Sequence, residues 1–295
     1  MKAQALYDPI NEHDACGVGL VANINNVASH QIVLQGITVL KRLMHRGAAG
    51  GDPETGDGAG LLLSMPHKFF RKVYEDLPAR YGVAMVFVNK SVACDVADAK
   101  IKEIAASEGV NLLHVREVPV NASAIGHTAR ETLPHIRQFF FDGSAFENDN
   151  AFEIKLFVIR RLIEKAIGDI YVCSCSQRTV VYKGLLLASQ IEAFYADLNN
   201  PDFESPIALV HQRYSTNTFP TWQLAHPFRY LAHNGEINTL RGNLNSLRSR
   251  EPHLKSDVIG DDLKKLLPLI PAGQSDSACL DNMFELLVAA GRSLP

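Results

Sequence analysis

The stretch Asp14-Ala15-Cys16-Gly17-Val18-Gly19 decides the fold and the chemistry that this sequence predicts. Cys16 stands just before an apolar run from Val18 to Val21, and such a run is typical of a buried strand. If the chain is cut after Ala15, Cys16 carries both a thiol nucleophile and a free α-amino group. An α-amino group titrates near ~8, so it can act as a general base at neutral pH. The alternative for this stretch alone is that Cys16 is a small, buried and unreactive side chain.

The residues before Cys16 do not have the pattern of a secretory signal peptide. They lack an apolar core, and the polar residues Asp8, Glu12 and His13 interrupt them. We therefore predict that residues 1–15 are a leader removed on maturation, and that residues 16–295 form the functional domain.

Composition limits the classes of protein and partner. The chain has 295 residues, of which 46% are hydrophobic, enough to bury a sizeable core. Its net charge of −3 gives no electrostatic reason to expect nucleic acid or an acidic membrane surface as a partner. No apolar run reaches the ~18 residues that cross a bilayer, so we expect no membrane partner.

The cysteines indicate neither disulfides nor a metal site. Their number, five, is odd, which argues against a disulfide framework and favours a reducing cytoplasm. Only one residue separates Cys173 from Cys175, a spacing that does not fit a zinc site, and no second Cys/His pair follows. We expect both side chains to pack within a strand.

Periodicity predicts alternating helices and strands, with no repeat or clear linker dividing the chain. A turn is expected at Gln177-Arg178, between two of the strands. Ser29 is the expected N-cap of the first helix. The expected helices are 29–44, 67–77, 91–108, 124–131, 148–167, 237–248 and 278–290, and the expected strands are 18–21, 61–64, 82–88, 111–119, 134–141, 170–174, 179–182, 207–211 and 230–233.

A loop rich in glycine and acidic residues spans residues 47–60. Glycines allow the backbone to pass close to another group, and predicted buried elements flank the loop on both sides. We expect it to line a site, with a flexible surface linker as the alternative.

An Asn-Gly pair follows the expected strand 230–233. Asn234 offers a side-chain amide and Gly235 a backbone N–H without a Cβ, and two such donors can form an oxyanion hole. Asn-Gly after a strand is usually a hairpin turn, but the residues that follow look helical, which weakens that reading. Further on, Asp276 stands at the start of a predicted helix, where it can serve as a cap, as a ligand for substrate, or as both.

Five segments together resemble the class II glutamine amidotransferases, which are N-terminal-nucleophile hydrolases. The resemblance runs over essentially the whole chain and is strongest to the amidotransferase domain of glutamate synthases, because a long interval separates Cys16 from His211. The segments are Ala15-Cys16-Gly17-Val18-Gly19, His45-Arg46-Gly47, His211-Gln212-Arg213-Tyr214-Ser215-Thr216, Leu231-Ala232-His233-Asn234-Gly235-Glu236-Ile237-Asn238 and Gln274-Ser275-Asp276-Ser277.

The resemblance implies a fold and a set of catalytic residues. The implied fold is of the α+β class, a four-layer αββα sandwich of the N-terminal-nucleophile hydrolase type, with Cys16 at the start of a central strand. Cys16 would be the nucleophile and its freed amine the base. Asn234 and Gly235 would form the oxyanion hole, and Arg46 would lie near the nucleophile.

The same resemblance implies the residues that bind substrate. Arg213 would hold the α-carboxylate of L-glutamine, since a guanidinium offers a carboxylate two parallel donors. Thr216 would help at that end, and Asp276 would hold the α-ammonium group.

The implied activity is release of ammonia from glutamine through a cysteinyl thioester, for use by glutamate synthase domains. The resemblance places FMN and an iron–sulfur cluster in those missing domains and no cofactor in this chain. It implies a cytoplasmic location, or the plastid stroma for a plant or algal protein. Two alternatives stay open: an N-terminal-Cys amidase acting on another amide, and a catalytically silent glutamine-sensing module that keeps its leader. The pair Arg213 and Asp276 favours an amino-acid substrate over an apolar acyl chain.

Overall fold

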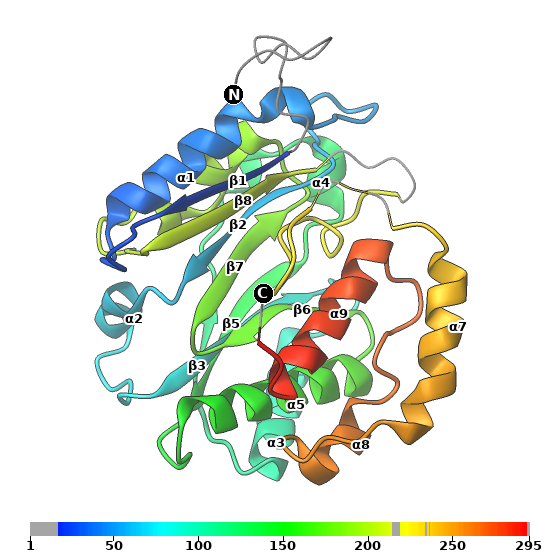
Figure 1. The fold of residues 1–295 in the computed structure, drawn as a ribbon. Helices are drawn as coiled ribbons and strands as arrows, with labels where there is room; N and C mark the ends of the chain where they lie inside the picture. The colour runs from blue at the N-terminus through cyan, green and yellow to red at the C-terminus, as the bar shows by residue number, and fades with distance from the viewer. Residues whose placement is uncertain (1–16, 214–218, 234, 236, 294–295) are drawn as a thin grey trace, which may run out of the picture.

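The structure is a computed structural model that describes residues 17–213, 219–233, 235 and 237–293 (Figure 1). The predictions for the leader 1–15 and for Cys16, Thr216 and Asn234 lie outside the described residues. In the part of the chain that is described, no helix has the length and apolarity needed to cross a membrane.

The first of two antiparallel sheets contains β1 (Val18–Ala22), β8 (Ile207–Gln212), β2 (Ala59–Ser64) and β7 (Thr179–Gly184), in that order. Among the described residues β1 pairs only with β8, so it lies at the edge of this sheet. The expected fold had implied a central strand at this position, and that expectation is wrong for the described sheet. β8 is central because it pairs with both β1 and β2.

The second sheet has the order β4 (Leu112–Glu117), β5 (His135–Asp142), β3 (Tyr81–Val88) and β6 (Ile170–Ser176). The expected turn at Gln177-Arg178 is present, but it joins strands of different sheets. β6 and β7 each bury apolar side chains in a core that the two sheets share. The two strands therefore join different sheets and do not form a hairpin with each other.

Helix α1 (His30–Arg42) covers the outer face of the first sheet, where it lies along β1 and β8 (Figure 1). Its predicted N-cap is confirmed, since Ser29 Oγ accepts the N–H of Ile32 at 3.4 Å. The apolar face of α1 joins the core that also contains side chains of β2 and β3.

Helices α3 (Cys94–Ser107) and α5 (Asp149–Ala166) bury their apolar faces on the second sheet. A separate core there combines side chains of α3 and α5 with those of β3 and β5. The described residues thus form a mixed α and β fold built on two antiparallel sheets.

The C-terminal helices α8 (Leu263–Leu266) and α9 (Asp276–Ala289) pack beside α5 (Figure 1). The other elements are η2 (Met44–Arg46), α2 (His67–Val73), η3 (Ala122–Ala124), α4 (His127–Glu131), η4 (Ala188–Gln190), α6 (Ile191–Phe194), η5 (Ala196–Asn199), α7 (Leu240–Arg250), η6 (Glu251–His253) and η7 (Gly260–Asp262).

The strand expected over residues 230–233 is wrong. The backbone of this segment bonds to side chains of other elements, because Tyr230 N donates to Asp281 Oδ1 at 2.7 Å and His233 O accepts from His211 Nε2 at 2.9 Å. The helix expected from residue 237 begins only at Leu240, because Thr239 has a left-handed backbone with φ of 62°.

Candidate active site

The residue that follows Cys16 lies at the end of the central strand β8. Gln212 N donates to Gly17 O at 2.7 Å, and Val18 is paired with His211. Arg213 comes next in the chain, so the predicted α-carboxylate ligand leaves the sheet beside the start of β1. Segments nearly 200 residues apart in the sequence therefore meet here.

The glycine-rich loop packs against the same strand end. Arg213 N donates to Gly58 O at 2.8 Å, and Gly58 has a φ of +135° that favours glycine. A Cβ at Gly47 would lie 2.2 Å from Gln212 Nε2, so this backbone passes too close for a side chain. The loop thus borders the site as expected, and the half-buried Arg46 directly precedes this contact.

Arg213 is buried, and the charges of two carboxylates act on it. Burial lowers the pKa of its guanidinium below the ordinary value, while the negative charges of Asp57 and Asp276 act in the opposite direction. The sequence analysis did not single out Asp57, which the structure buries to 7% exposure; the signal available in the sequence was an acidic residue inside a glycine-rich loop. The structure brings the predicted ligands Arg213 and Asp276 into one electrostatic site, from the end of β8 and the start of α9.

Asp276 is not the N-cap of its helix. That role belongs to Ser275, whose Oγ accepts the N–H of Ala278 at 3.2 Å. The Asp276 carboxylate instead accepts the N–H of Ile237 on Oδ2 at 2.9 Å and that of Ser277 on Oδ1 at 2.7 Å. It therefore connects α9 to the segment that contains Gly235.

Gly235, the predicted oxyanion donor, lies in this segment. Its N–H donates to Nδ1 of His233 at 3.1 Å, and Nε2 of the same ring lies 2.8 Å from Ser277 Oγ. The sequence analysis did not single out His233 or Ser277, although both stand inside quoted motifs. Asp276 thus connects two other predicted site residues, because it bonds to the segment of Gly235 and its charge acts on Arg213.

Comparison with known proteins identifies the family of the chain. Residues 16–295 match the family described as glutamine amidotransferases class-II. The chain belongs to this family. The matched part of the chain contains every predicted site residue and begins at Cys16 itself.

Relatives of this class II amidotransferase chain include glutamate synthase large chains. It is 50% identical to the NADPH large chain of Bacillus subtilis, over 99% of this chain and 20% of the relative. It is 43% identical to the NADPH large chain of Azospirillum brasilense, over 98% of this chain and 20% of the relative. It is 41% identical to ferredoxin-dependent glutamate synthase 1 of Arabidopsis thaliana, over 98% of this chain and 19% of the relative. The chain thus spans about a fifth of the length of these relatives.

A stacked histidine pair lies at the end of β8, near Arg213 in the sequence. The ring centroids of His211 and His226 are 4.3 Å apart, and burial, followed by the charge of His211, lowers the pKa of His226 well below its ordinary value. Burial also lowers the pKa of Lys183 to about 7. Lys183 Nζ donates to the carbonyl oxygens of Gln223 at 3.0 Å and Ala225 at 2.7 Å, which holds the segment before His226 on β7.

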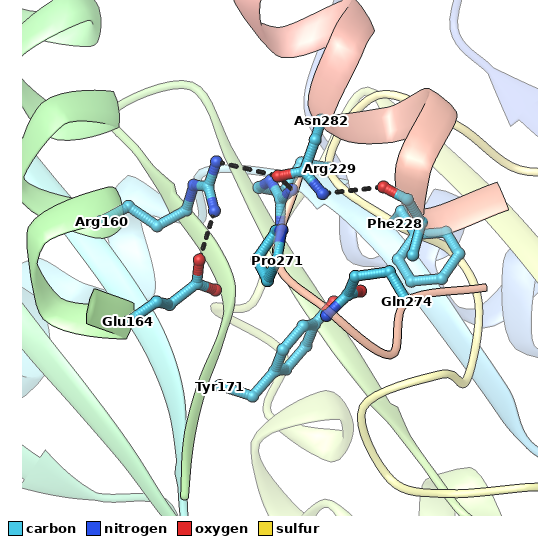
Figure 2. A pocket seen from close by; sticks show the side chains of 9 residues that line it. Arg160, Glu164, Tyr171, Phe228, Arg229, Pro271, Gln274 and Asn282 are labelled. Atoms are coloured by element: carbon cyan, nitrogen blue, oxygen red, sulfur yellow. Dashed lines mark hydrogen bonds and ion pairs between the residues drawn. The ribbon is translucent and has the colours of Figure 1, made fainter. Parts of the chain in front are cut away.

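A buried ion network fixes α9 in this amidotransferase, and Figure 2 shows the part of it around Arg160, Glu164 and Arg229. Arg160 of α5 bonds to Glu285 at 3.1 Å and to Glu164 at 2.6 Å. Arg229 bonds to the same Glu285 at 2.9 Å and to Asp281 at 2.8 Å. Burial alone would lower the pKa of Arg229, but the carboxylates of Glu285 and Asp281 hold it well above its ordinary value. The small cavity in Figure 2 has a volume of about 10 Å³ and is bordered by Arg160, Glu164 and Arg229, so it leaves little room for water beside these charges.

Three of the described cysteines have thiols whose pKa is raised by burial. Burial raises the pKa of Cys173 to about 12 and that of Cys279 to about 11, and it also raises the pKa of Cys175. A thiol with a raised pKa is a poor nucleophile at neutral pH. Cys94 is half-buried at the start of α3. Within the described ranges, no group of three or more His, Cys, Asp or Glu side chains is arranged to hold a metal ion.

Proposed function

We propose that this chain hydrolyses L-glutamine to glutamate and ammonia through a thioester on Cys16. The observation that carries the proposal is the burial of a cation, Arg213, within reach of the charge of Asp276. An α-amino acid presents a carboxylate and an ammonium group on one carbon, and opposite charges in one site match that pair. Gly17, the residue after Cys16, is hydrogen-bonded beside Arg213.

Removal of residues 1–15 frees the α-amino group of Cys16. This amine takes the thiol proton, and the sulfur attacks the side-chain amide carbon of glutamine. Asn234 stabilises the oxyanion together with the N–H of Gly235, which leaves His233 Nδ1 to meet the substrate, and Arg46 borders the nucleophile. The protonated amine then gives its proton to the leaving nitrogen, so ammonia departs and a glutamyl thioester remains. Water hydrolyses the thioester, with the same amine as base.

The substrate is held at its α-carbon. Arg213 and Thr216 bind the α-carboxylate, and Asp276 binds the α-ammonium. The start of the family match at Cys16 supports the leader 1–15 and the domain 16–295. An intact mass that begins at Cys16 is expected, and a retained Met1 would favour the silent glutamine-sensing alternative.

We further propose that the fold is the four-layer αββα sandwich of N-terminal-nucleophile hydrolases. Three observations support it: α1 packs on the outer face of the first sheet, the two sheets share a core, and α3 and α5 pack on the far face of the second sheet. These are the contacts that such a stack of layers requires.

The ammonia is proposed to feed glutamate synthesis, because the relatives are glutamate synthases and this chain spans about a fifth of their length. FMN and an iron–sulfur cluster would belong to the synthase domains that receive the ammonia. Such an enzyme would act in the cytoplasm, or in a plastid for a chain of plant origin.

The test incubates the chain with glutamine and 2-oxoglutarate, adding NADPH, NADH or reduced ferredoxin in turn. We expect one glutamate and one ammonia per glutamine, and none with Cys16→Ala as the matched control. A ratio of two glutamates would reveal reductive amination within these 295 residues. Failure of the mature chain to release ammonia from glutamine, together with turnover of another amide, would favour the general amidase.

A further inference from the structure

The side-chain amide of Gln212 lies at the end of β8, beside Gly17. Gln212 N donates to Gly17 O at 2.7 Å, so the two residues are neighbours on adjacent strands. The side chain of Gln212 is buried, with the residue only 1% exposed. Among the described residues, none supplies a hydrogen-bond donor to its Oε1, although this atom is buried. A buried amide oxygen without a donor costs free energy, which indicates that a further group bonds to it.

The nitrogen of the same amide has a partner, and this bond orients the side chain. Gln212 Nε2 donates to Gly58 O at 3.4 Å, and a carbonyl oxygen can accept only from the nitrogen of the amide. Gly58 directly precedes β2, which lies on the opposite side of β8 from β1. The backbone of Gly47, where a Cβ would lie 2.2 Å from Nε2, leaves the amide little room to turn. The oxygen Oε1 is therefore held facing away from Gly58.

The missing donor can come from the mature N-terminus. One residue of chain separates the α-amine of Cys16 from Gly17 N, and one residue spans at most ~3.6 Å. Before cleavage this nitrogen is a peptide N–H with a single hydrogen. Removal of the leader turns it into an amine with additional N–H donors, attached to β1 next to the strand that carries Gln212.

We propose that Gln212 is a positioning residue whose amide oxygen accepts a hydrogen bond from the freed α-amine of Cys16. This inference rests on the proposed glutaminase function. With one N–H held by Oε1, the amine does not rotate freely, and its lone pair can face the thiol that it deprotonates. Once the amine has taken the thiol proton it is an ammonium group, and the bond to Oε1 becomes charge-assisted and stronger. Gln212 itself neither gains nor loses a proton.

The test measures kcat and KM for glutamine across the pH range in which an α-amine titrates. It uses chains whose intact mass shows that they begin at Cys16. Gln212→Met removes the acceptor at similar side-chain length, and Gln212→Glu replaces it by a carboxylate of the same shape. The matched control is Gln138→Met, because Gln138 is a fully buried glutamine of β5 in the other sheet.

The acid limb of the kcat/KM profile reports the pKa of the α-amine, because only the neutral amine can act as base. In Gln212→Met this limb should move about one pH unit lower and kcat should fall about five- to tenfold, with little change in KM. The limb should move to higher pH in Gln212→Glu, because a carboxylate stabilises the ammonium form. It should not move in Gln138→Met. The charged residues around the end of β8, which are Arg46, Asp57 and Arg213, are identical in all these chains, so a shift reports position 212.

An acid limb that stays in place in both Gln212 variants would overturn the inference. Because glutamate has the shape of glutamine, Gln212→Glu decides the question on its own if Gln212→Met does not mature. An unaltered mature chain that releases no ammonia from glutamine would overturn the proposed function itself, and the inference with it.

Discussion

His211 Nε2 donates a hydrogen bond to the carbonyl oxygen of His233 at 2.9 Å. This bond ties the end of the central strand β8 to the residue just before Asn234. Because Arg213 leaves the same strand two residues after His211, one rigid element supports both the proposed oxyanion loop and the proposed carboxylate ligand. The expected effects of substitution at the two positions are nevertheless different.

At the oxyanion position, Asn234→Ala should lower kcat by about 10²–10³, with little change in KM. The amide of Asn234 is proposed to meet charge that develops only in the transition state, so its loss does not weaken substrate binding. Steady-state kinetics on the mature chain measure both constants. A rise in KM at unchanged kcat would mean that Asn234 positions the substrate instead.

At the other end of the site, Asp276→Asn should raise KM for glutamine roughly 10- to 100-fold, as expected for loss of a charged hydrogen bond. The asparagine oxygen can still accept the N–H of Ile237, which Asp276 accepts at 2.9 Å, so the fold should persist. Arg213→Lys should act in the same direction, because an ammonium cannot offer the two parallel donors. Circular dichroism serves as the fold control. Unchanged KM values would refute both binding roles.

Glu285 should be a strong determinant of stability. It bonds to Arg160 at 3.1 Å and to Arg229 at 2.9 Å, so Glu285→Gln leaves two buried cations short of a counter-charge. We expect the free energy of unfolding to fall by about 3 kcal/mol or more. The matched control is Glu103→Gln on the surface of α3, which should change it by less than about 1 kcal/mol. Urea denaturation of both variants measures the difference, and equal losses would contradict a structural role for the network.

The buried amine of Lys183 should make the free energy of unfolding depend on pH. Its pKa is lowered by burial to about 7 in the folded chain, against an ordinary value of 10.5. Between these values the unfolded chain binds more protons than the folded chain, so the free energy of unfolding increases with pH, by at most about 1.4 kcal/mol per pH unit. Below pH 7 the full cost of the buried charge remains.

The comparison for this effect is Lys183→Met, which has no titrating amine. The difference in unfolding free energy between the unaltered chain and the variant should increase in favour of the unaltered chain from pH 7 to pH 10. Denaturation curves at three pH values suffice. A constant difference would show that Lys183 keeps its proton in the folded state throughout.

Much of the fold could be predicted from local patterns. The helix capped by Ser29 and the amphipathic helix α5 follow from apolar spacing and capping chemistry, which act within a few residues. The predictions that failed concern segments whose structure depends on residues far away in the sequence. Residues 230–233 are apolar like a strand, but Asp281 and His211 take their backbone bonds. The crossing between β6 and β7 depends on which sheet each strand joins, and the turn sequence does not encode that choice.

The candidate site shows the same division. The motifs of the candidate site could be recognised in the sequence, because the chemistry requires particular residue types close together in the chain. His233, Asp57 and Ser277 were missed because their contacts form only when β8, the glycine-rich loop and α9 meet. The ion network around Glu285 could not be predicted either, since its charges lie on α5, on α9 and, for Arg229, in a loop, and in the sequence they resemble solvent-exposed residues.

The central claim is that Cys16 is the nucleophile. The most direct measurement treats the mature chain with a glutamine analogue carrying an electrophilic side chain and locates the adduct by peptide mass spectrometry. We predict one label on the peptide that begins at Cys16, prevented by excess glutamine. The half-buried Cys94 is an internal control for general thiol reactivity and should remain unmodified. A label on Cys94, Cys173, Cys175 or Cys279, with Cys16 unmodified, would contradict the account.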